Sequence, residues 1–362
     1  MAPVTALAAL GWHDALDDAF ASHGASGLVP ARVIVAYGPT YRVQGVSGEF
    51  LADTSGRLRH DAATRRDLPV VGDWVAVKPT TIEGGRASIQ AVLPRSSLFS
   101  RKAAGNETVE QVLAANVDTA FLVTALDRDF NLRRLERYLA MTRESGAAPV
   151  IVLNKADLSA DVDEQRREVE RVARGVPVHV TVARASEGLD GLAPYLQPGR
   201  TIAVLGSSGV GKSTLINRLL GHERLATREV RESDARGRHT TTHRELVTLP
   251  GGALLIDTPG MRELQLWSAD SGMDEAFDDI AALARACFFG NCGHETEPRC
   301  AVKAAVERGE LAPERLENYR KLRREQDALA RRQDALADQA HKKQVRAIHR
   351  NMRRTFNPKG RS

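Results

Sequence analysis

Between about residues 30 and 94, the chain alternates short apolar runs with glycine- and proline-rich turns. The runs are rich in β-branched side chains, a pattern that is typical of strands. Short strands at this spacing favour a small barrel of the oligonucleotide-binding (OB) fold, with a small sandwich or an SH3-like barrel as the alternative. The predicted strands are 31–37, 41–46, 72–78 and 87–92.

After about residue 115 the pattern changes, and strand-like apolar runs alternate with helical stretches. This alternation predicts a mostly parallel sheet that is covered by helices on both faces. Ligands of such sheets bind at the carboxyl ends of the strands. The predicted strands are 118–124, 149–153, 176–182, 201–205, 245–249 and 253–256, and the predicted helices are 132–145, 163–174 and 211–220.

Beyond about residue 273 the pattern is helical around one cysteine-rich loop. Leu322, Leu329 and Leu336 lie one heptad apart, but three leucines are a weak coiled-coil signal, so packing of this helix onto its own domain is the better interpretation. The chain is thus predicted to be an α/β multidomain protein. Its expected parts are a short N-terminal helix and OB barrel in 1–100, an α/β domain in 101–272 and an α-helical domain in 273–362.

The charge is concentrated at the C-terminal end. The formal net charge is +5, but residues 313–362 hold 15 Lys or Arg against 6 Asp or Glu. From His341 onward there are eight basic residues and no acidic one. A basic segment on a mildly acidic body favours a polyanionic partner, although a solvated helix face would explain a charge run equally well.

Composition argues against three classes of protein. No window approaches 18 uncharged apolar residues, so no transmembrane helix is expected. The first 20 residues contain aspartates but no Lys or Arg, which argues against a signal peptide. Three cysteines cannot form a disulfide framework. We therefore expect a cytoplasmic protein with no membrane partner.

The residues that follow the predicted strand 201–205 match the phosphate-binding loop G-x-x-x-x-G-K-[ST], and a helix comes next. The glycines let backbone N–H groups turn inward as an anion nest at a helix N-terminus. Lys212 is expected to reach the β- and γ-phosphates, and Ser213 is expected to ligate Mg²⁺. The predicted nucleotide contacts here are Gly206, Ser207, Ser208, Gly209, Val210, Gly211, Lys212, Ser213 and Thr214.

A second candidate loop follows the predicted strand 149–153 and reads Asn154, Lys155, Ala156, Asp157. A carboxylate there can accept two hydrogen bonds from the ring N–H and the amino group of guanine, which adenine cannot supply. Leaving that acceptor unpaired is costly, so the loop would disfavour ATP. A polar turn without function is the alternative, since Asn, Lys and Asp are common in loops.

A third candidate segment, Asp-Thr-Pro-Gly at 257–260, follows the predicted strand 253–256. Asp257 is expected to hold Mg²⁺ through water, and Gly260 is expected to present its N–H to the γ-phosphate. Between the two phosphate-binding segments lies the polar loop 237–242. Thr241, or a threonine next to it, is expected to complete the Mg²⁺ coordination.

The order of these motifs is unusual. A regular GTPase runs from the phosphate loop through D-x-x-G to N-K-x-D, whereas here Asn154 comes 52 residues before Gly206. Either the N-K-x-D match is accidental or the domain is circularly permuted. A permuted domain keeps the same strand–helix pattern, because chain ends in compact domains often lie close together and can be joined. Permutation also explains the loop 182–188, where the Ala183 N–H is placed to reach the carbonyl oxygen of guanine.

All three cysteines and one histidine lie within 14 residues, at Cys287, Cys292, His294 and Cys300. Three thiolates and one imidazole form a closed tetrahedral zinc set. Four protein ligands leave no position for a catalytic water, so the predicted role of one bound Zn²⁺ is structural. Three buried free thiols beside a surface histidine are the alternative.

Together these motifs resemble the circularly permuted GTPases of small ribosomal subunit biogenesis, the ribosome small subunit-dependent GTPase A family. The resemblance extends to Gly72-Asp-Trp-Val and to Leu10-Gly-Trp12. It implies an OB barrel, a permuted GTPase domain and a C-terminal zinc domain. It also implies a monomer that binds GTP or GDP, docks on the 30S subunit and its 16S rRNA late in maturation, and hydrolyses GTP there. One departure is Val182, where the family usually has a serine.

The residue after Gly260 is Met261, where many GTPases place a glutamine that orients the attacking water. Because methionine cannot orient water, another group must do so. His239 is the candidate that the resemblance also favours, and a loop histidine touching only solvent or RNA is the alternative. Such a site should be slow alone and faster when a partner orders the loop.

The leading hypothesis is therefore a GTP hydrolase that the 30S subunit stimulates. An RNA-binding scaffold in which nucleotide only tunes affinity would share every motif. An ATPase or a small-molecule kinase would leave Asp157 without a purpose. The residues predicted to contribute to catalysis are Lys212, His239, Thr241 and Gly260.

Overall fold

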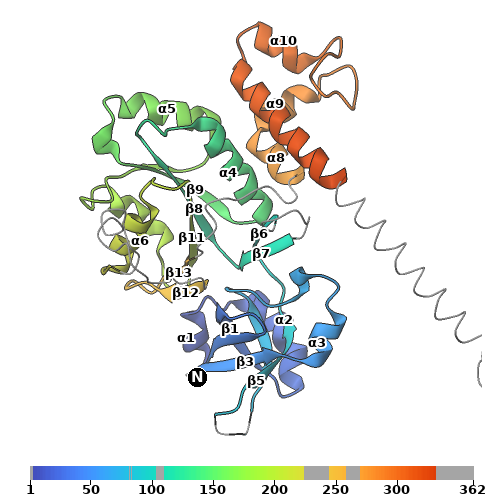
Figure 1. Ribbon diagram of the computed structural model, residues 1–362, viewed down its shortest axis with the longest axis vertical. Helices are drawn as coiled ribbons and strands as arrows, with labels where there is room; N and C mark the ends of the chain where they lie inside the picture. The colour runs from blue at the N-terminus through green and yellow to red at the C-terminus, as the bar shows by residue number, and fades with distance from the viewer. Residues whose placement is uncertain are drawn as a thin grey trace, which may run out of the picture. The chain divides into compact units, whose positions relative to one another are not determined.

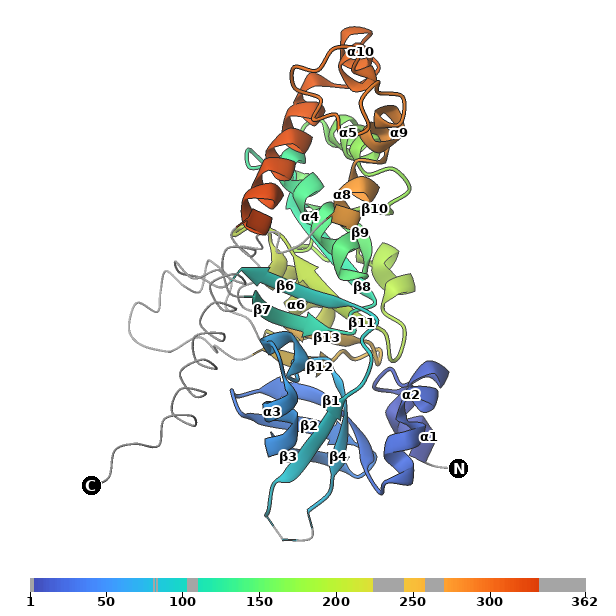
Figure 2. The same ribbon diagram turned by 90° about the vertical axis from the view of Figure 1, so that its right-hand side faces the viewer.

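The computed structural model describes residues 3–80, 82, 84–102, 110–223, 244–257 and 270–331. The chain divides into two compact units (Figures 1 and 2). Met1–Arg101 and Glu110–Ala282 belong to the first unit, and the part from Leu283 onward belongs to the second.

A five-stranded barrel forms the N-terminal part of the first unit, which confirms the predicted OB-type fold (Figure 1). Tyr41 and Val43, two residues apart on one strand, both point into its apolar core, as the alternating pattern requires. The strands follow the order β1 (Val29–Ala36), β2 (Thr40–Gly45), β3 (Gly48–Thr54), β5 (Ala87–Val92) and β4 (Trp74–Lys78), and β4 pairs with β1 to close the barrel.

Strand β3 was not among the predicted strands, because its sequence GEFLADT has two adjacent large apolar residues instead of a clear alternation. One of them, Leu51, is exposed. Short helical segments surround the barrel strands in the sequence. They are α1 (Pro3–Ala8) and α2 (Asp14–Ala25) before β1, and α3 (Gly56–Asp61) and η1 (Arg65–Asp67) between β3 and β4.

The rest of the first unit contains a mostly parallel sheet, as predicted. Among the described strands of this part of the sheet, β8 to β13, only β12 runs antiparallel to its neighbour, β13. Strand β12 also pairs with β1, through Val35 and Glu245, and this pairing joins the sheet to the barrel. The order is β10 (Val178–Val180), β9 (Ala148–Asn154), β8 (Thr119–Ala125), β11 (Thr201–Leu205), β13 (Leu254–Asp257) and β12 (Glu245–Thr248).

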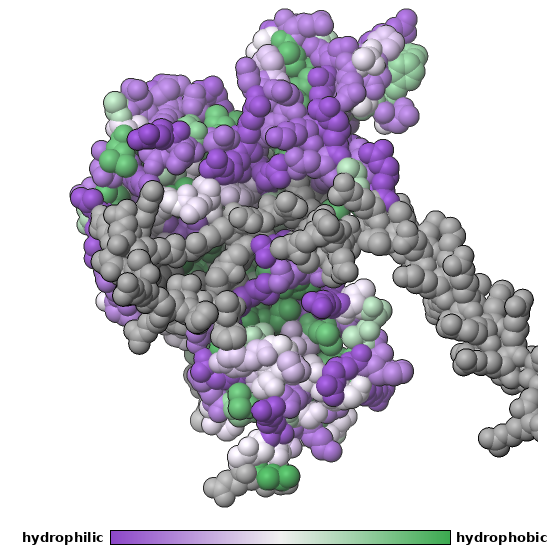
Figure 3. All heavy atoms as spheres, in the orientation of Figure 1, coloured by the Kyte–Doolittle hydropathy of each residue, from purple (hydrophilic) through white to green (hydrophobic). Residues whose placement is uncertain are grey.

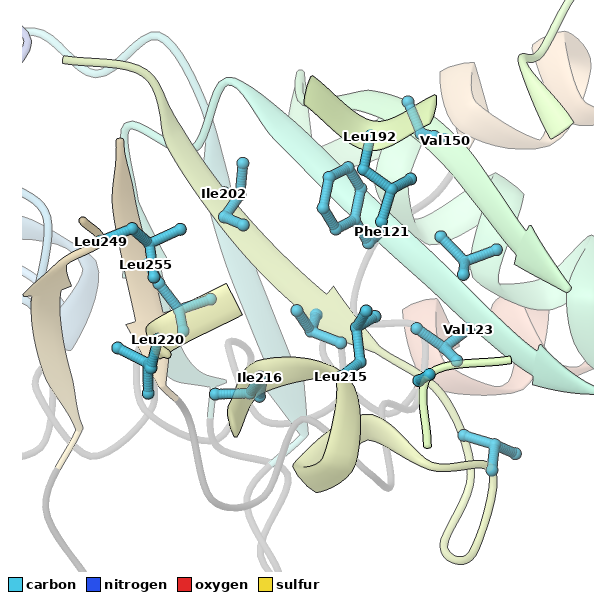
Figure 4. Packing of buried hydrophobic residues seen from close by; sticks show 14 of the residues in the cluster. Phe121, Val123, Val150, Leu192, Ile202, Leu215, Ile216, Leu220, Leu249 and Leu255 are labelled. Atoms are coloured by element: carbon cyan, nitrogen blue, oxygen red, sulfur yellow. The ribbon is translucent and has the colours of Figure 1, made fainter. Parts of the chain in front are cut away.

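Helices cover both faces of this sheet. On one face, α6 (Lys212–Leu220) contributes Leu215 to an apolar cluster that includes Phe121 and Ile202 (Figure 4). Because successive strand residues point to opposite faces, Leu122 lies on the other face, where α4 (Leu132–Ser145) packs against β8 and β9. The remaining helical segments are η2 (Ala156–Leu158), α5 (Val162–Val172), η3 (Leu189–Tyr195) and α8 (Asp270–Ala276).

A small sheet of two strands, β6 (Leu98–Lys102) and β7 (Glu110–Ala115), was not predicted. The two strands lie on either side of residues 103–109 in the chain. The sequence of β6, LFSRK, does not alternate regularly between apolar and polar residues, so the pattern gave no strand signal.

A buried arginine holds the barrel, the N-terminal helices and the parallel sheet together. Arg32 Nε donates to Gly72 O (3.2 Å), and Nη2 donates to Thr201 Oγ1 (2.9 Å) and Asn116 O (3.1 Å). Nη1 donates to Leu10 O. Burial lowers the pKa of Arg32 to about 10, so the side chain stays charged at neutral pH. Because Thr201 begins β11, this arginine fixes the strand that leads into the phosphate loop.

The second unit contains α10 (Ala301–Glu307) and a helix over residues 313–331, and α9 (Asp278–Ala284) spans the boundary between the units. Leu322 is fully buried, and Tyr319 of the same helix has its ring 6.1 Å from that of His294, so the last described helix contacts its own unit as expected. Leu336 and the basic segment from His341 onward lie outside the described residues.

The described part of the face in Figure 3 is largely hydrophilic. None of the described helices has the length and apolarity that a membrane crossing needs.

Candidate functional site

The phosphate loop connects β11 to α6 at the carboxyl edge of the parallel sheet, as the sequence predicted. Gly206, Gly209 and Gly211 all have positive φ values (149°, 84° and 97°). A Cβ at Gly206 would lie 2.3 Å from Val123 O, and one at Gly211 would lie 2.2 Å from Asn154 Nδ2. Two of the glycines are therefore required by close packing as well as by backbone conformation.

Asn154 connects the phosphate loop to both segments of the expected guanine site. It ends β9 and is buried, and its Nδ2 donates to Val210 O in the phosphate loop (2.9 Å). Its Oδ1 accepts from the Ala183 N–H (3.0 Å) and from Thr181 Oγ1 (3.2 Å). The structure thus brings together three loops that are far apart in the sequence.

The Ala183 N–H was expected to reach guanine, but its acceptor in the structure is Asn154 Oδ1. Donation to guanine would require this N–H to be shared between two acceptors. That contact stays a prediction, and the role that the geometry supports for Ala183 is to orient Asn154.

Lys155 and Asp157 follow Asn154 directly in the same loop. Lys155 has a positive φ of 61°, and its Nζ donates to Asp127 Oδ2 (2.8 Å) at the end of β8. Although burial opposes it, the hydrogen bond from Lys155 holds the pKa of Asp127 below its usual value. Asp157 is exposed, and its carboxylate accepts no hydrogen bond from any described residue. It is free to accept from a ligand.

Lys212 and Ser213 begin α6. Lys212 Nζ donates to Gly206 O (2.7 Å) and also to Ser207 O, so the ammonium lies over the phosphate loop itself. Ser213 is half-buried one residue later. The backbone of Asp257 ends β13, which pairs with β11, so Asp257 reaches the same edge of the sheet. The roles of Ser213 and Asp257 as Mg²⁺ ligands stay a prediction.

Several predicted residues lie outside the described part of the chain. They are His239, Thr241, Gly260 and Met261, together with the rest of the polar loop 237–242. Their predicted roles are therefore not tested by the geometry.

The cysteine–histidine set is assembled in the second unit. The ligand atoms of Cys287, Cys292, His294 and Cys300 all lie within 4.8 Å of one another. Cys287 Sγ lies 3.9 Å from Cys300 Sγ and 3.7 Å from His294 Nδ1. Burial lowers the pKa of His294, which favours the neutral imidazole that metals bind.

These distances fit a tetrahedral metal site. With Zn–S bonds of about 2.3 Å, tetrahedral geometry places the sulfurs about 3.8 Å apart, close to the observed separation. Cys300 also accepts a hydrogen bond from the Lys303 N–H (3.5 Å) and so caps α10. A metal held by this set would connect α10 to the loop that carries the other three ligands.

Sequence reasoning missed three residues of the nucleotide site. Asp127 pairs with Lys155, Thr181 donates to Asn154, and Arg134 Nη1 donates to Ser207 Oγ (2.9 Å). Each partner lies far away in the sequence, so no local pattern marks them. Only the position of Asp127 just after a predicted strand was a usable signal.

The fold and the order of its motifs define a circularly permuted GTPase of the P-loop class. The strand that ends at Asn154 precedes the phosphate loop in the chain, yet the Asn154 side chain reaches that loop across the carboxyl end of β8 and donates to Val210 O. Comparison with known proteins leads to the same class.

The chain belongs to the RsgA family of small ribosomal subunit biogenesis GTPases. The family profile described as RsgA GTPase matches residues 92–267. "Small ribosomal subunit biogenesis GTPase RsgA" of Opitutus terrae is 50% identical over 355 residues, covering 96% of this chain and 97% of that protein. The protein of the same name from Syntrophotalea carbinolica is 44% identical, covering 95% and 96%.

Two solved structures have the same architecture. YjeQ from Thermotoga maritima has a TM-score of 0.62 at 28% identity and covers 83% of this chain and 98% of its own. YloQ, described as a circularly permuted GTPase, has a TM-score of 0.57 at 25% identity and covers 83% and 96%. The prediction of a circularly permuted domain is thus confirmed, and the alternative of an accidental N-K-x-D match is not supported.

Proposed function

We propose that this protein binds GTP at the phosphate loop, docks on the small ribosomal subunit during its maturation, and hydrolyses GTP there at a rate that the subunit raises. The single observation that carries the nucleotide part is the buried Asn154, which joins Val210 of the phosphate loop to Ala183 of the second guanine loop. Membership of the biogenesis GTPase family supports the ribosomal part.

In the proposed reaction, water attacks the γ-phosphorus as the bond to the β–γ bridging oxygen breaks, which releases GDP and phosphate. The backbone N–H groups of the phosphate loop and Lys212 would hold the β- and γ-phosphates. Ser213, Thr241 and Asp257 are the residues that would hold Mg²⁺, which supplies charge neutralisation when bound. Gly260 would donate its N–H to the γ-phosphate.

Base selection is assigned to Asp157, whose carboxylate is free. We expect Asp157→Asn to weaken GTP binding about 10- to 100-fold, because the amide presents a donor where guanine needs an acceptor. The same variant should gain affinity for xanthosine triphosphate, whose carbonyl replaces the guanine amino group. Competition binding of GTP, ATP and the xanthine nucleotide measures this, with Asp163→Asn in the exposed first turn of α5 as the control.

Equal affinity of the wild-type protein for ATP and GTP would remove the guanine assignment. Unchanged nucleotide preference in Asp157→Asn would move base recognition to another residue.

Water orientation is assigned to His239, because Met261 cannot do it. Turnover of the wild-type protein should be slow alone and faster with saturating 30S subunits. His239→Ala should lose about 100-fold of the stimulated rate while GTP affinity stays close to that of the wild type, since a group that acts on the attacking water contributes mainly in the transition state. The matched control is His222→Ala, which removes an exposed histidine just beyond α6.

Two results would contradict this assignment. Absence of any stimulation by 30S subunits would favour the scaffold, in which nucleotide only tunes affinity. Full stimulation of His239→Ala, with normal subunit binding, would leave the water to be oriented by backbone or by ribosomal RNA.

The cysteine–histidine set is assigned to one structural Zn²⁺. All four positions are filled by protein atoms, so no open position exists for a water or substrate. The metal would stabilise the second unit, and the unit would present a rigid surface to the ribosomal subunit.

A further inference from the structure

Arg134 is a described residue at the phosphate loop that the function proposed above does not use. It lies in the first turn of α4, where its backbone N–H donates to the Asn131 cap (2.9 Å). Its side chain leaves the helix and ends on the phosphate loop, with Nη1 2.9 Å from Ser207 Oγ. This contact joins residues that are 73 positions apart in the chain.

Two cationic groups therefore meet at Ser207. Arg134 donates to its hydroxyl, and Lys212 Nζ donates to its carbonyl oxygen. Among the described residues, no carboxylate lies within ion-pair distance of Arg134, so the acceptor that it has there is a neutral hydroxyl. A guanidinium binds an anionic phosphate oxygen more strongly than a neutral hydroxyl, because the two charges attract, and its planar fork suits two phosphate oxygens.

The shared residue indicates which phosphate is involved. In a phosphate loop of this type, the backbone cradles the α- and β-phosphates, and the lysine reaches the β- and γ-phosphates. Because Arg134 reaches the loop at a residue that Lys212 also contacts, a nucleotide bound in this way would have its β- and γ-phosphates nearest to Arg134.

The geometry points to Arg134 as an intrinsic arginine that binds the γ-phosphate of GTP and makes the site prefer GTP over GDP. This inference rests on the proposed function, since GTP must occupy the phosphate loop. An arginine in this position supplies from within the chain a positive charge that other GTPases receive from a partner protein.

The test compares affinities for a non-hydrolysable GTP analogue and for GDP by titration calorimetry on the full chain. Arg134→Ala should weaken binding of the analogue about 10-fold or more and change GDP binding less than about twofold. Arg134→Lys keeps the positive charge but loses the planar guanidinium. Its affinity for the GTP analogue should therefore lie between those of the wild-type protein and Arg134→Ala. The matched control is Arg128→Ala. Arg128 is exposed in the loop before α4, and its replacement removes the same charge as Arg134→Ala does.

Equal losses for both nucleotides would overturn the inference, because they would place Arg134 on the β-phosphate or give it a purely structural role. Unchanged affinities in both Arg134 variants would overturn it as well. If Arg134→Ala failed to fold, the Arg134→Lys variant would decide, since a selective loss for the analogue supports the γ-phosphate contact and an equal loss excludes it. Failure of the wild-type protein to bind either nucleotide would instead overturn the proposed function on which the inference rests.

Discussion

Replacing Cys300 with serine is expected to remove the bound zinc and to unfold the described helices of the second unit. Cys300 is buried, supplies one of the four ligand atoms and caps α10 through its sulfur. Structural zinc contributes about 10–16 kcal/mol in small domains, because the site does not exist in the unfolded chain.

The apolar core of this unit is too small to replace that contribution. Among its described residues, the buried apolar side chains are few and come mainly from two helices. They are Val302, Ala305, Leu311, Leu316, Tyr319 and Leu322.

Metal analysis and hydrogen exchange on the full chain would measure the effect. We expect one zinc per wild-type chain and less than a tenth of that in Cys300→Ser, with protection lost in α10 and in residues 313–331 but kept in β11. Asn291→Ser is the control, since Asn291 is an exposed non-ligand in the same loop. A Cys300→Ser protein that kept its zinc and its protection would refute the site.

The parts of the fold that the sequence predicted well are those whose information is local. Strand β11, the phosphate loop and α6 follow one another without a gap, so the motif and its setting could be read together. The three cysteines and the histidine of the candidate metal site likewise lie within 14 residues. In both cases the chemistry needs residues that are close in sequence as well as in space.

The parts that were missed depend on contacts between distant segments. Arg32 stands in a run that was correctly predicted as a strand, but its full burial depends on acceptors at Leu10, Gly72 and Thr201. Nothing near Arg32 in the sequence specifies those acceptors. The same reason applies to Arg134, because β9, α5, β10 and β11 lie between it and its partner on the phosphate loop in the chain.

The motif order shows what a single sequence can establish about topology. Asn154 and Val210 are 56 residues apart and in the reverse of the usual order, yet their contact is the one that a nucleotide site requires. Circular permutation moves the chain ends without moving the strands, so the site chemistry was predictable although the connectivity was not regular. The accidental match, which sequence alone left open, would not have produced this contact.

Asn154→Ala is expected to weaken binding of GTP and GDP by about 100-fold or more. The change leaves Val210 O, the Ala183 N–H and the Thr181 hydroxyl without their partner in a buried region, at a cost of about 1–3 kcal/mol for each unpaired group. It also removes the side chain against which Gly211 packs. The phosphate loop and the guanine loops would then no longer be held at a fixed separation.

The loss should be the same for both nucleotides, which distinguishes it from the effects of the other two variants in this site. Asp157→Asn should change the choice of base, and Arg134→Ala should change the preference for GTP over GDP. Asn154→Asp provides the matched comparison, because its carboxylate still accepts from the Ala183 N–H and from Thr181 but cannot donate to Val210 O. Calorimetry would measure the affinities of both variants for GTP and GDP, and the melting temperature of the nucleotide-free protein would check folding. Comparing the two variants separates the bond that Asn154 donates to Val210 O from the bonds that it accepts from Ala183 and Thr181. Wild-type affinity in Asn154→Ala would show that the phosphate loop and the guanine loops are positioned independently of each other.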